Sequence, residues 1–133
     1  MLDFLKLADW CTVNDYEAKL LCERTGRELA DLAREVKALI VTLGGNGSEI
    51  YANGQRLAIP CVTPEAMMDP TGCGDAYRSG LLYGIGQGWS WEKTGRLASL
   101  MGGIKIAHRG GQNHKPTRNV IADQFQKAFG EIL

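Results

Sequence analysis

The sequence lacks the features that mark several common classes of protein. Its 133 residues carry 15 Lys and Arg against 15 Asp and Glu, so the formal net charge is zero. This balance gives no support to nucleic acid or an anionic membrane as a partner. No apolar run approaches the roughly 20 residues that a membrane-spanning helix needs, and the first residues lack the basic-then-apolar pattern of a signal peptide. We therefore expect a cytoplasmic protein that binds neither nucleic acid nor membrane.

The chain has four cysteines, and their spacing argues against both a redox Cys-x-x-Cys site and a zinc site. No two cysteines form a Cys-x-x-Cys pair, and none has a zinc-like spacing to either histidine. We interpret all four as reduced thiols, in keeping with a cytoplasmic protein. They are Cys11, Cys22, Cys61 and Cys73.

The two commonest phosphate-binding loops, the Walker loop and Gly-x-Gly-x-x-Gly, are also missing. What the chain does contain, within residues 68–80, is a glycine-rich turn that leads directly into a helical pattern. Asp69-Pro70 marks a loop, and Thr71-Gly72-Cys73-Gly74 precedes the apolar positions of the helix. Free backbone N–H groups and the positive end of the helix dipole create an anion site at such a point. Asp75 either caps this helix or serves as a base beside a bound phosphate.

The spacing of apolar residues predicts a layered α/β fold. Residues 38–43 form a continuous apolar run with β-branched members, which is typical of a buried strand in a parallel sheet. Asn53-Gly54 predicts a hairpin turn. A central strand in so small a sheet suggests that part of the sheet is missing. Helices are expected at 2–8, 14–26, 27–37, 74–87, 91–108 and 119–131, and strands at 10–13, 38–43, 48–52 and 56–59.

Three further segments suit phosphate chemistry, and each also has an ordinary structural explanation. Asn14 and Glu17 lie one helical turn apart, which suits either water-mediated Mg²⁺ binding or a simple capping box. Thr42 and Gly44 follow a buried strand, where α/β sheets place ligands, or they form a plain strand-to-turn junction. The glycine-rich loop at 109–114 can border a ligand or merely end a helix.

Taken in order, these segments resemble motifs of the ribokinase-like (PfkB) carbohydrate and adenosine kinases. Residues 69–77 are similar to the family's signature Asp-Thr-x-Gly-Ala-Gly-Asp-x-Phe. Asn14-x-x-Glu17 is similar to its Asn-x-x-Glu motif, and Thr42-x-Gly44 to its Thr-x-Gly segment. The resemblance implies a ribokinase-like layered fold with a mostly parallel sheet flanked by helices. Residues 1–133 would be the C-terminal nucleotide-binding and catalytic half, without the substrate-binding and lid half.

The resemblance implies an ATP-dependent phosphotransferase that acts on a primary hydroxyl of a sugar or nucleoside, with adenosine as one candidate. Asp75 would be the general base that takes the hydroxyl proton. Backbone N–H groups of Gly72, Cys73 and Gly74 would form an anion hole over the transferring phosphate. Such roles are coherent, because phosphoryl transfer depends mainly on positioning and charge neutralisation.

The same resemblance implies the ligand sites. Asn14 and Glu17 would hold hydrated Mg²⁺. Asp69, together with the loop at 109–114, would ligate a potassium-like monovalent cation. ATP would be bordered by Thr42, Gly44, Gly111, Gln112 and His114.

The signature also departs from the family pattern. Pro70 replaces Thr, Tyr77 replaces Phe, and Cys73 replaces a small Ala. Cys73 is either a small space-filling residue or a thiol whose pKa is lowered by the helix start, alkylatable and protected by ATP.

Two alternatives to an active sugar or nucleoside kinase remain open. The first is a catalytically inert nucleotide-binding or assembly module that dimerises through an open sheet edge, since such an edge is a pairing template. The second is a vitamin-precursor kinase of the same superfamily.

Overall fold

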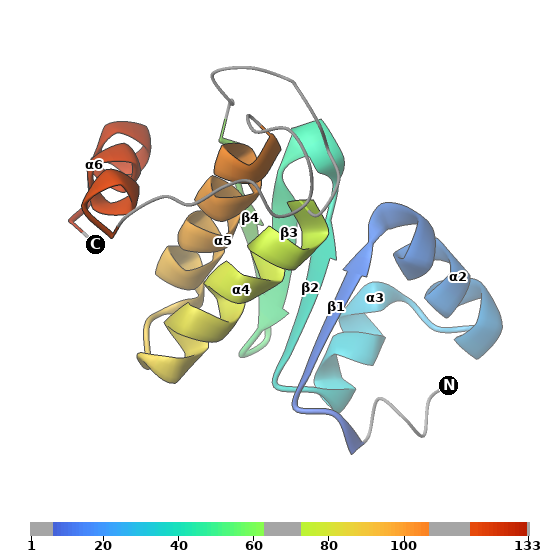
Figure 1. Ribbon diagram of the computed structural model, residues 1–133. Coiled ribbons are helices and arrows are strands. Elements are labelled where there is room, and N and C mark those ends of the chain that lie inside the picture. Colours follow the sequence, from blue (N-terminus) through green and yellow to red (C-terminus); the bar gives the residue numbers. More distant parts are fainter. Residues whose placement is uncertain (1–6, 63–72, 107–117, 133) are drawn as a thin grey trace. The chain divides into compact units, whose positions relative to one another are not determined.

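A computed structural model describes residues 7–62, 73–106 and 118–132 (Figure 1). The chain divides into two compact units. Met1–Ile59, the N-terminal unit, holds the sheet, and Pro60–Leu133, the helical unit, holds helices. No helix of the described residues is both long and apolar enough to cross a membrane.

The N-terminal unit is built on one four-stranded sheet with the strand order β1-β2-β3-β4. β1 pairs parallel with β2, whereas β2–β3 and β3–β4 are antiparallel. The strands are β1 (Trp10–Asn14), β2 (Ala38–Thr42), β3 (Ser48–Ala52) and β4 (Gln55–Ile59), and the connections contain α2 (Asp15–Thr25), α3 (Leu29–Leu32) and the short 3₁₀ turns η1 (Ala33–Glu35) and η2 (Gly44–Asn46).

The layered α/β fold is thus confirmed, but the prediction of a mostly parallel sheet is wrong for the described strands. The lengths of the connections explain why most pairs are antiparallel. β2 reaches β3 through the short turn at η2, and β3 reaches β4 through Asn53-Gly54 alone. A parallel pair needs a crossover of a dozen or more residues, and such a crossover, containing α2 and α3, links only β1 to β2. The hairpin prediction is confirmed by the positive φ of Asn53 (54°) and Gly54 (72°).

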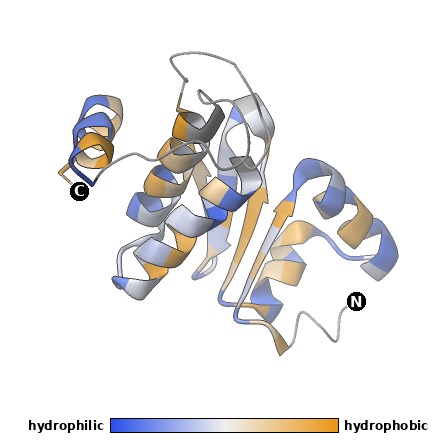
Figure 2. Cartoon of the chain, viewed as in Figure 1, coloured by the Kyte–Doolittle hydropathy of each residue, from blue (hydrophilic) through white to orange (hydrophobic). Residues whose placement is uncertain are grey.

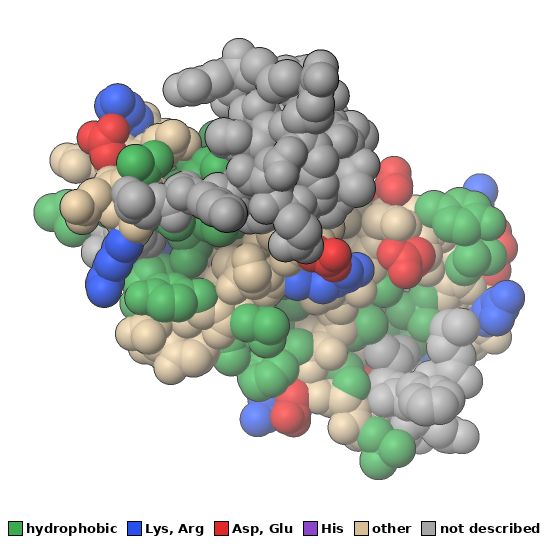
Figure 3. All heavy atoms as spheres, in the orientation of Figure 1, with side chains coloured by type: hydrophobic (Ala, Val, Ile, Leu, Met, Phe, Trp, Pro, Cys, Tyr) green, Lys and Arg blue, Asp and Glu red, His purple; other side chains and the backbone are tan. Residues whose placement is uncertain are grey.

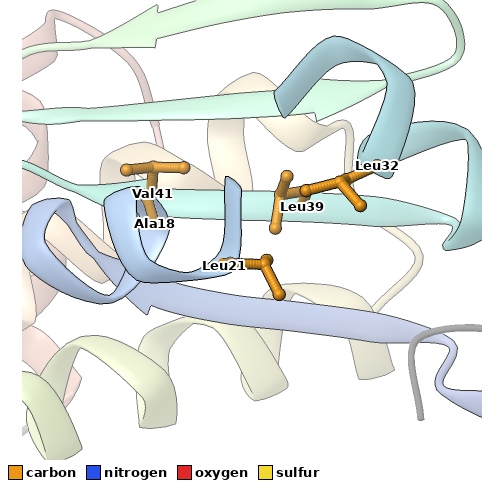
Figure 4. Close-up of a cluster of buried hydrophobic side chains, with 5 residues drawn as sticks. All are labelled: Ala18, Leu21, Leu32, Leu39 and Val41. Carbon is orange, nitrogen blue, oxygen red and sulfur yellow. The ribbon is translucent and has the colours of Figure 1, made fainter. Parts of the chain in front are cut away.

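β2 is the buried strand that its composition predicts. Ala38, Leu39 and Ile40 are fully buried and Val41 is 3% exposed, so side chains on both faces of the strand are covered. Most of the strand is coloured as hydrophobic in Figure 2. Leu39 and Val41 share one face and pack against Ala18 and Leu21 of α2 and Leu32 of α3 (Figure 4).

The helix expected over residues 27–37 is much shorter than predicted. α3 covers only Leu29–Leu32 and continues as η1, after which Val36 is already extended (φ −130°, ψ 162°). The backbone N–H of Lys37 donates to the carbonyl of Asp9 at 2.7 Å, just ahead of the first β1–β2 pair. Strand pairing therefore ends this helix earlier than its apolar spacing suggests.

The helical unit contains α4 (Cys73–Gly86), α5 (Trp91–Ile106) and α6 (Arg118–Phe129), as predicted to within a few residues. Its core joins Leu97, Leu100 and Ile104 of α5 to Phe125 of α6. α4 packs on α5 at close range, because a Cβ on Gly80 would lie 2.6 Å from the Cα of Ala98. The start of α4, where Asp75 lies, is thus carried by a helix that is closely packed against its neighbour.

Several predicted features lie outside the described residues. They are most of the helix at 2–8, the turn residues Asp69 to Gly72, and the loop at 109–114.

Candidate functional site

Asn14 and Glu17 form a complete capping box at the start of α2. The Asn14 Oδ1 accepts from the Glu17 backbone N–H at 2.7 Å, and Glu17 Oε1 accepts from the Asn14 N–H at 3.0 Å. The structural explanation of this pair is therefore confirmed. Both side chains are exposed, so the cap also leaves their outer atoms open to solvent.

Thr42 lies directly beside this cap, because Asn14 and Thr42 are register partners at the last step of the parallel β1–β2 pair. The Thr42 hydroxyl donates to the Val13 carbonyl at 3.4 Å. Gly44 follows with φ 59°, a left-handed conformation that glycine adopts without strain. Two of the predicted segments therefore meet at the carboxyl edge of the parallel strands, the usual ligand edge of α/β sheets.

The electrostatics at this edge act on a neighbouring thiol. Burial raises the pKa of Cys11, and the negative charge of Glu17 raises it further. Cys11 therefore stays protonated at neutral pH and is a poor nucleophile. Among the described residues, Cys11, Cys22 and Cys61 are free cysteines.

Asp75 lies in the first turn of α4, and its side chain is 83% exposed. Its Oδ1 accepts from Arg78 Nη1 at 3.2 Å, one helical turn along. Cys73 and Gly74 are the first residues of the same helix, where backbone N–H groups lack intrahelical acceptors. The arrangement presents a carboxylate orientated by Arg78 next to backbone N–H groups that need acceptors from outside the helix, which suits proton abstraction beside an anion.

The remaining predicted site residues are not described by the structure. Gly72 of the anion hole, the cation ligand Asp69, and the nucleotide-bordering residues Gly111, Gln112 and His114 all lie in its gaps. Among the described residues, no group of three or more His, Cys, Asp or Glu side chains could hold a metal ion directly.

One feature of the helical unit has no counterpart in the sequence predictions. α4, α5 and α6 enclose a cleft of about 390 Å³ whose lining includes Tyr83, Met101 and Arg118. No local signal marks it, because its lining residues come from three separate helices.

The family follows from a comparison with models of known families. The model of the pfkB family carbohydrate kinases matches residues 1–118. The chain belongs to the pfkB family.

Solved structures of this family match over nearly the whole chain. The nucleoside kinase of Burkholderia thailandensis in complex with inosine is 50% identical, with a TM-score of 0.96 over 99% of this chain and 44% of that one. The ribokinase of Thermotoga maritima, at 21% identity and a TM-score of 0.81, shares the fold over 96% of this chain and 45% of that one. The ribokinase-like fold is therefore confirmed.

Relatives found by sequence comparison also match over nearly the whole chain. The nucleoside kinase of Methanocaldococcus jannaschii is 30% identical over 127 residues, which cover 96% of this chain and 42% of the relative. The ribokinase of Lactococcus lactis is 30% identical over 95% of this chain and 41% of the relative. The chain thus spans about two fifths of the length of the curated pfkB relatives that it matches.

Proposed function

We propose that this chain supplies the nucleotide-binding and catalytic half of an ATP-dependent kinase that phosphorylates a hydroxyl of a nucleoside or sugar. Membership of the pfkB family supports the reaction class. The 50% identity to the Burkholderia nucleoside kinase, whose structures include complexes with inosine and with ADP and inosine, supports a nucleoside. Inosine and adenosine are therefore the first acceptors to test, with ribose as the sugar alternative.

The exposed carboxylate of Asp75 in the first turn of α4 is the observation that carries this proposal. Arg78 bonds its Oδ1, which leaves Oδ2 for the acceptor hydroxyl. In the reaction, the acceptor oxygen bonds to the γ-phosphorus of ATP, Asp75 takes the hydroxyl proton, and ADP leaves. A base placed within reach of its proton contributes about 10²- to 10⁴-fold to such a step.

The start of α4 also supplies an anion hole. The backbone N–H groups of Gly72, Cys73 and Gly74 would donate to the transferring phosphate, since the first N–H groups of a helix lack intrahelical acceptors. Fixed donors of this kind stabilise the charge that builds up during phosphoryl transfer.

The edge formed by Asn14, Glu17, Thr42 and Gly44 would hold the phosphate chain and its metal. The capping box uses only one oxygen of Glu17, so the other can bind a water of hydrated Mg²⁺. This fits Mg²⁺, which keeps several of its waters and needs few protein ligands. When bound, Mg²⁺ would neutralise phosphate charge. Asp69 would ligate a potassium-like ion, and Gly111, Gln112 and His114 would border the nucleotide.

The test is transfer of labelled phosphate from [γ-³²P]ATP to inosine, adenosine or ribose by the protein that carries this chain. Asp75→Asn is expected to lower turnover by about 10²- to 10⁴-fold while ATP affinity stays within a few-fold. Asp123→Asn is the matched control, because Asp123 is also an exposed helical acid paired one turn away, with Lys127 at 3.0 Å. Near-normal turnover of Asp75→Asn would refute the assignment of the base.

A second candidate is an inert nucleotide-binding module that assembles through β1. Within the described residues β1 has a strand neighbour on one side only, and such an edge can pair with another chain. Light scattering and calorimetry separate the two candidates. A stable dimer that binds ATP but transfers no phosphate to any acceptor would favour assembly, whereas labelled product would exclude the inert module.

A further inference from the structure

The cleft of the helical unit has the dimensions and composition of a small-molecule site. Its volume of about 390 Å³ falls within the range of ligand pockets. Leu97 and Met101 of α5 and Ile121 of α6 supply its apolar walls. Its polar groups are few, and the charged one is Arg118, the first residue of α6. The composition therefore favours a ligand that is mainly apolar with one polar end.

Arg118 determines the charge of that end. Elsewhere in the described chain, Arg27, Arg78 and Arg96 pair with carboxylates at 2.6–3.2 Å. Arg118 takes part in none of the ion pairs formed between described residues, and its side chain lines the cleft. A guanidinium group binds carboxylate, sulfonate or phosphate through paired N–H donors.

The opposite wall of the cleft is held in place before any ligand binds. Tyr83 of α4 and Trp89 form a T-shaped pair, with ring centroids 5.5 Å apart. Lys93 lies 4.4 Å above the Trp89 ring, which fixes that ring in turn. Tyr83 is nevertheless 43% exposed, and hydrophobic side chains are visible at the surface over α4 in Figure 3. An aromatic ring that is fixed but open to solvent is suited to stack on a flat ligand.

We propose that the cleft between α4, α5 and α6 binds a small organic anion with an aromatic body. The body would lie between Tyr83 and the apolar walls, and the acid group would be held by Arg118. This proposal does not depend on the phosphotransfer reaction, because none of these residues belongs to the segments assigned to ATP or to the proposed base.

The probe for the test is 1-anilinonaphthalene-8-sulfonate, an aromatic anion whose fluorescence rises in an apolar site. N-phenyl-1-naphthylamine is its uncharged counterpart. Arg118→Gln is expected to weaken binding of the sulfonate by about tenfold or more, since it removes a charge-assisted hydrogen bond. The same change should leave affinity for the neutral probe within about twofold. Lys127→Gln, a charge removal elsewhere on α6, is the control and should change neither.

A second experiment fills the cleft with a larger side chain. Ile121→Trp is expected to abolish saturable binding of both probes. Ser79→Leu, at a more exposed position of the lining, does the same with less risk to folding, and circular dichroism checks that each variant keeps its helices. Equal affinity of the sulfonate for the wild type, Arg118→Gln and Ser79→Leu would overturn the proposal, because the probe would then bind elsewhere.

Discussion

The first turns of α2 and α4 each hold an acidic residue at the third helical position, Glu17 and Asp75, and the two carboxylates have different surroundings. At the start of α2, Glu17 bonds the backbone N–H of Asn14 and completes a capping box. At the start of α4, Asp75 is exposed and meets only the side chain of Arg78 among the contacts described above. The first carboxylate helps to begin its helix, whereas the second makes no capping contact among those described above and keeps one oxygen outside its pair with Arg78. The difference separates a carboxylate with a visible capping role from one for which we propose a chemical role.

Removing each charge tests this comparison most strongly. Asp75→Asn and Glu17→Gln both replace a carboxylate by an amide of the same shape, and Gln still completes a capping box. Asp75→Asn should lower turnover by about 10²- to 10⁴-fold. Glu17→Gln should lower it by about 10- to 100-fold, as for groups that hold a metal's outer shell, and added Mg²⁺ should restore part of the loss. Equal losses that Mg²⁺ does not affect would remove the distinction between base and metal holder.

The close contact of α4 with α5 gives the next largest effect. Gly80→Ala places a Cβ 2.6 Å from backbone of Ala98, so the helices must move apart, at a cost of about 1–3 kcal/mol in the free energy of unfolding. Gly86→Ala is the matched control, because its Cβ meets nothing within 4 Å and should stabilise by about 0.4–1 kcal/mol. Urea unfolding measures both. If the two substitutions shift the midpoint equally, packing does not hold the helix that carries Asp75.

Local sequence signals predicted most of the fold and part of the site. The α2 cap and the Asn53-Gly54 hairpin depend only on residues close together in the sequence, so local patterns were enough to predict both. The contact of Asn14 with Thr42 was not explicit in the sequence, but it follows from the rule that parallel strands end at the same edge. α3 was misjudged because strand pairing, a tertiary effect, overrides helical spacing at Val36. The cleft was missed for a similar reason, because Tyr83 and Arg118 approach only when three helices pack.

The reactivity of two cysteines, Cys11 in β1 and Cys73 at the start of α4, provides a further test. The pKa of Cys11 is raised by burial and by Glu17, whereas thiols at helix starts in general react more readily, which is the sequence-based hypothesis for Cys73. Iodoacetamide should therefore modify Cys73 about tenfold or more faster than Cys11 at neutral pH, as read by peptide mass spectrometry. ATP should slow the labelling of Cys73 only. Equal rates with and without ATP would contradict the proposed anion hole.

The smallest effect concerns the cap itself, and it decides whether Asn14 does more than begin a helix. Asn14→Ala removes the acceptor for the Glu17 N–H and should cost about 1 kcal/mol of stability. Asn14→Ser keeps a capping oxygen, so thermal unfolding should return to near the wild-type temperature. If the Asn14→Ser variant also has the full turnover of the wild type, the Asn14 side chain serves as a cap alone. If stability recovers while the dependence on Mg²⁺ remains shifted, the amide contributes directly to the edge that it shares with Thr42, and the start of α2 is then functional as well as structural.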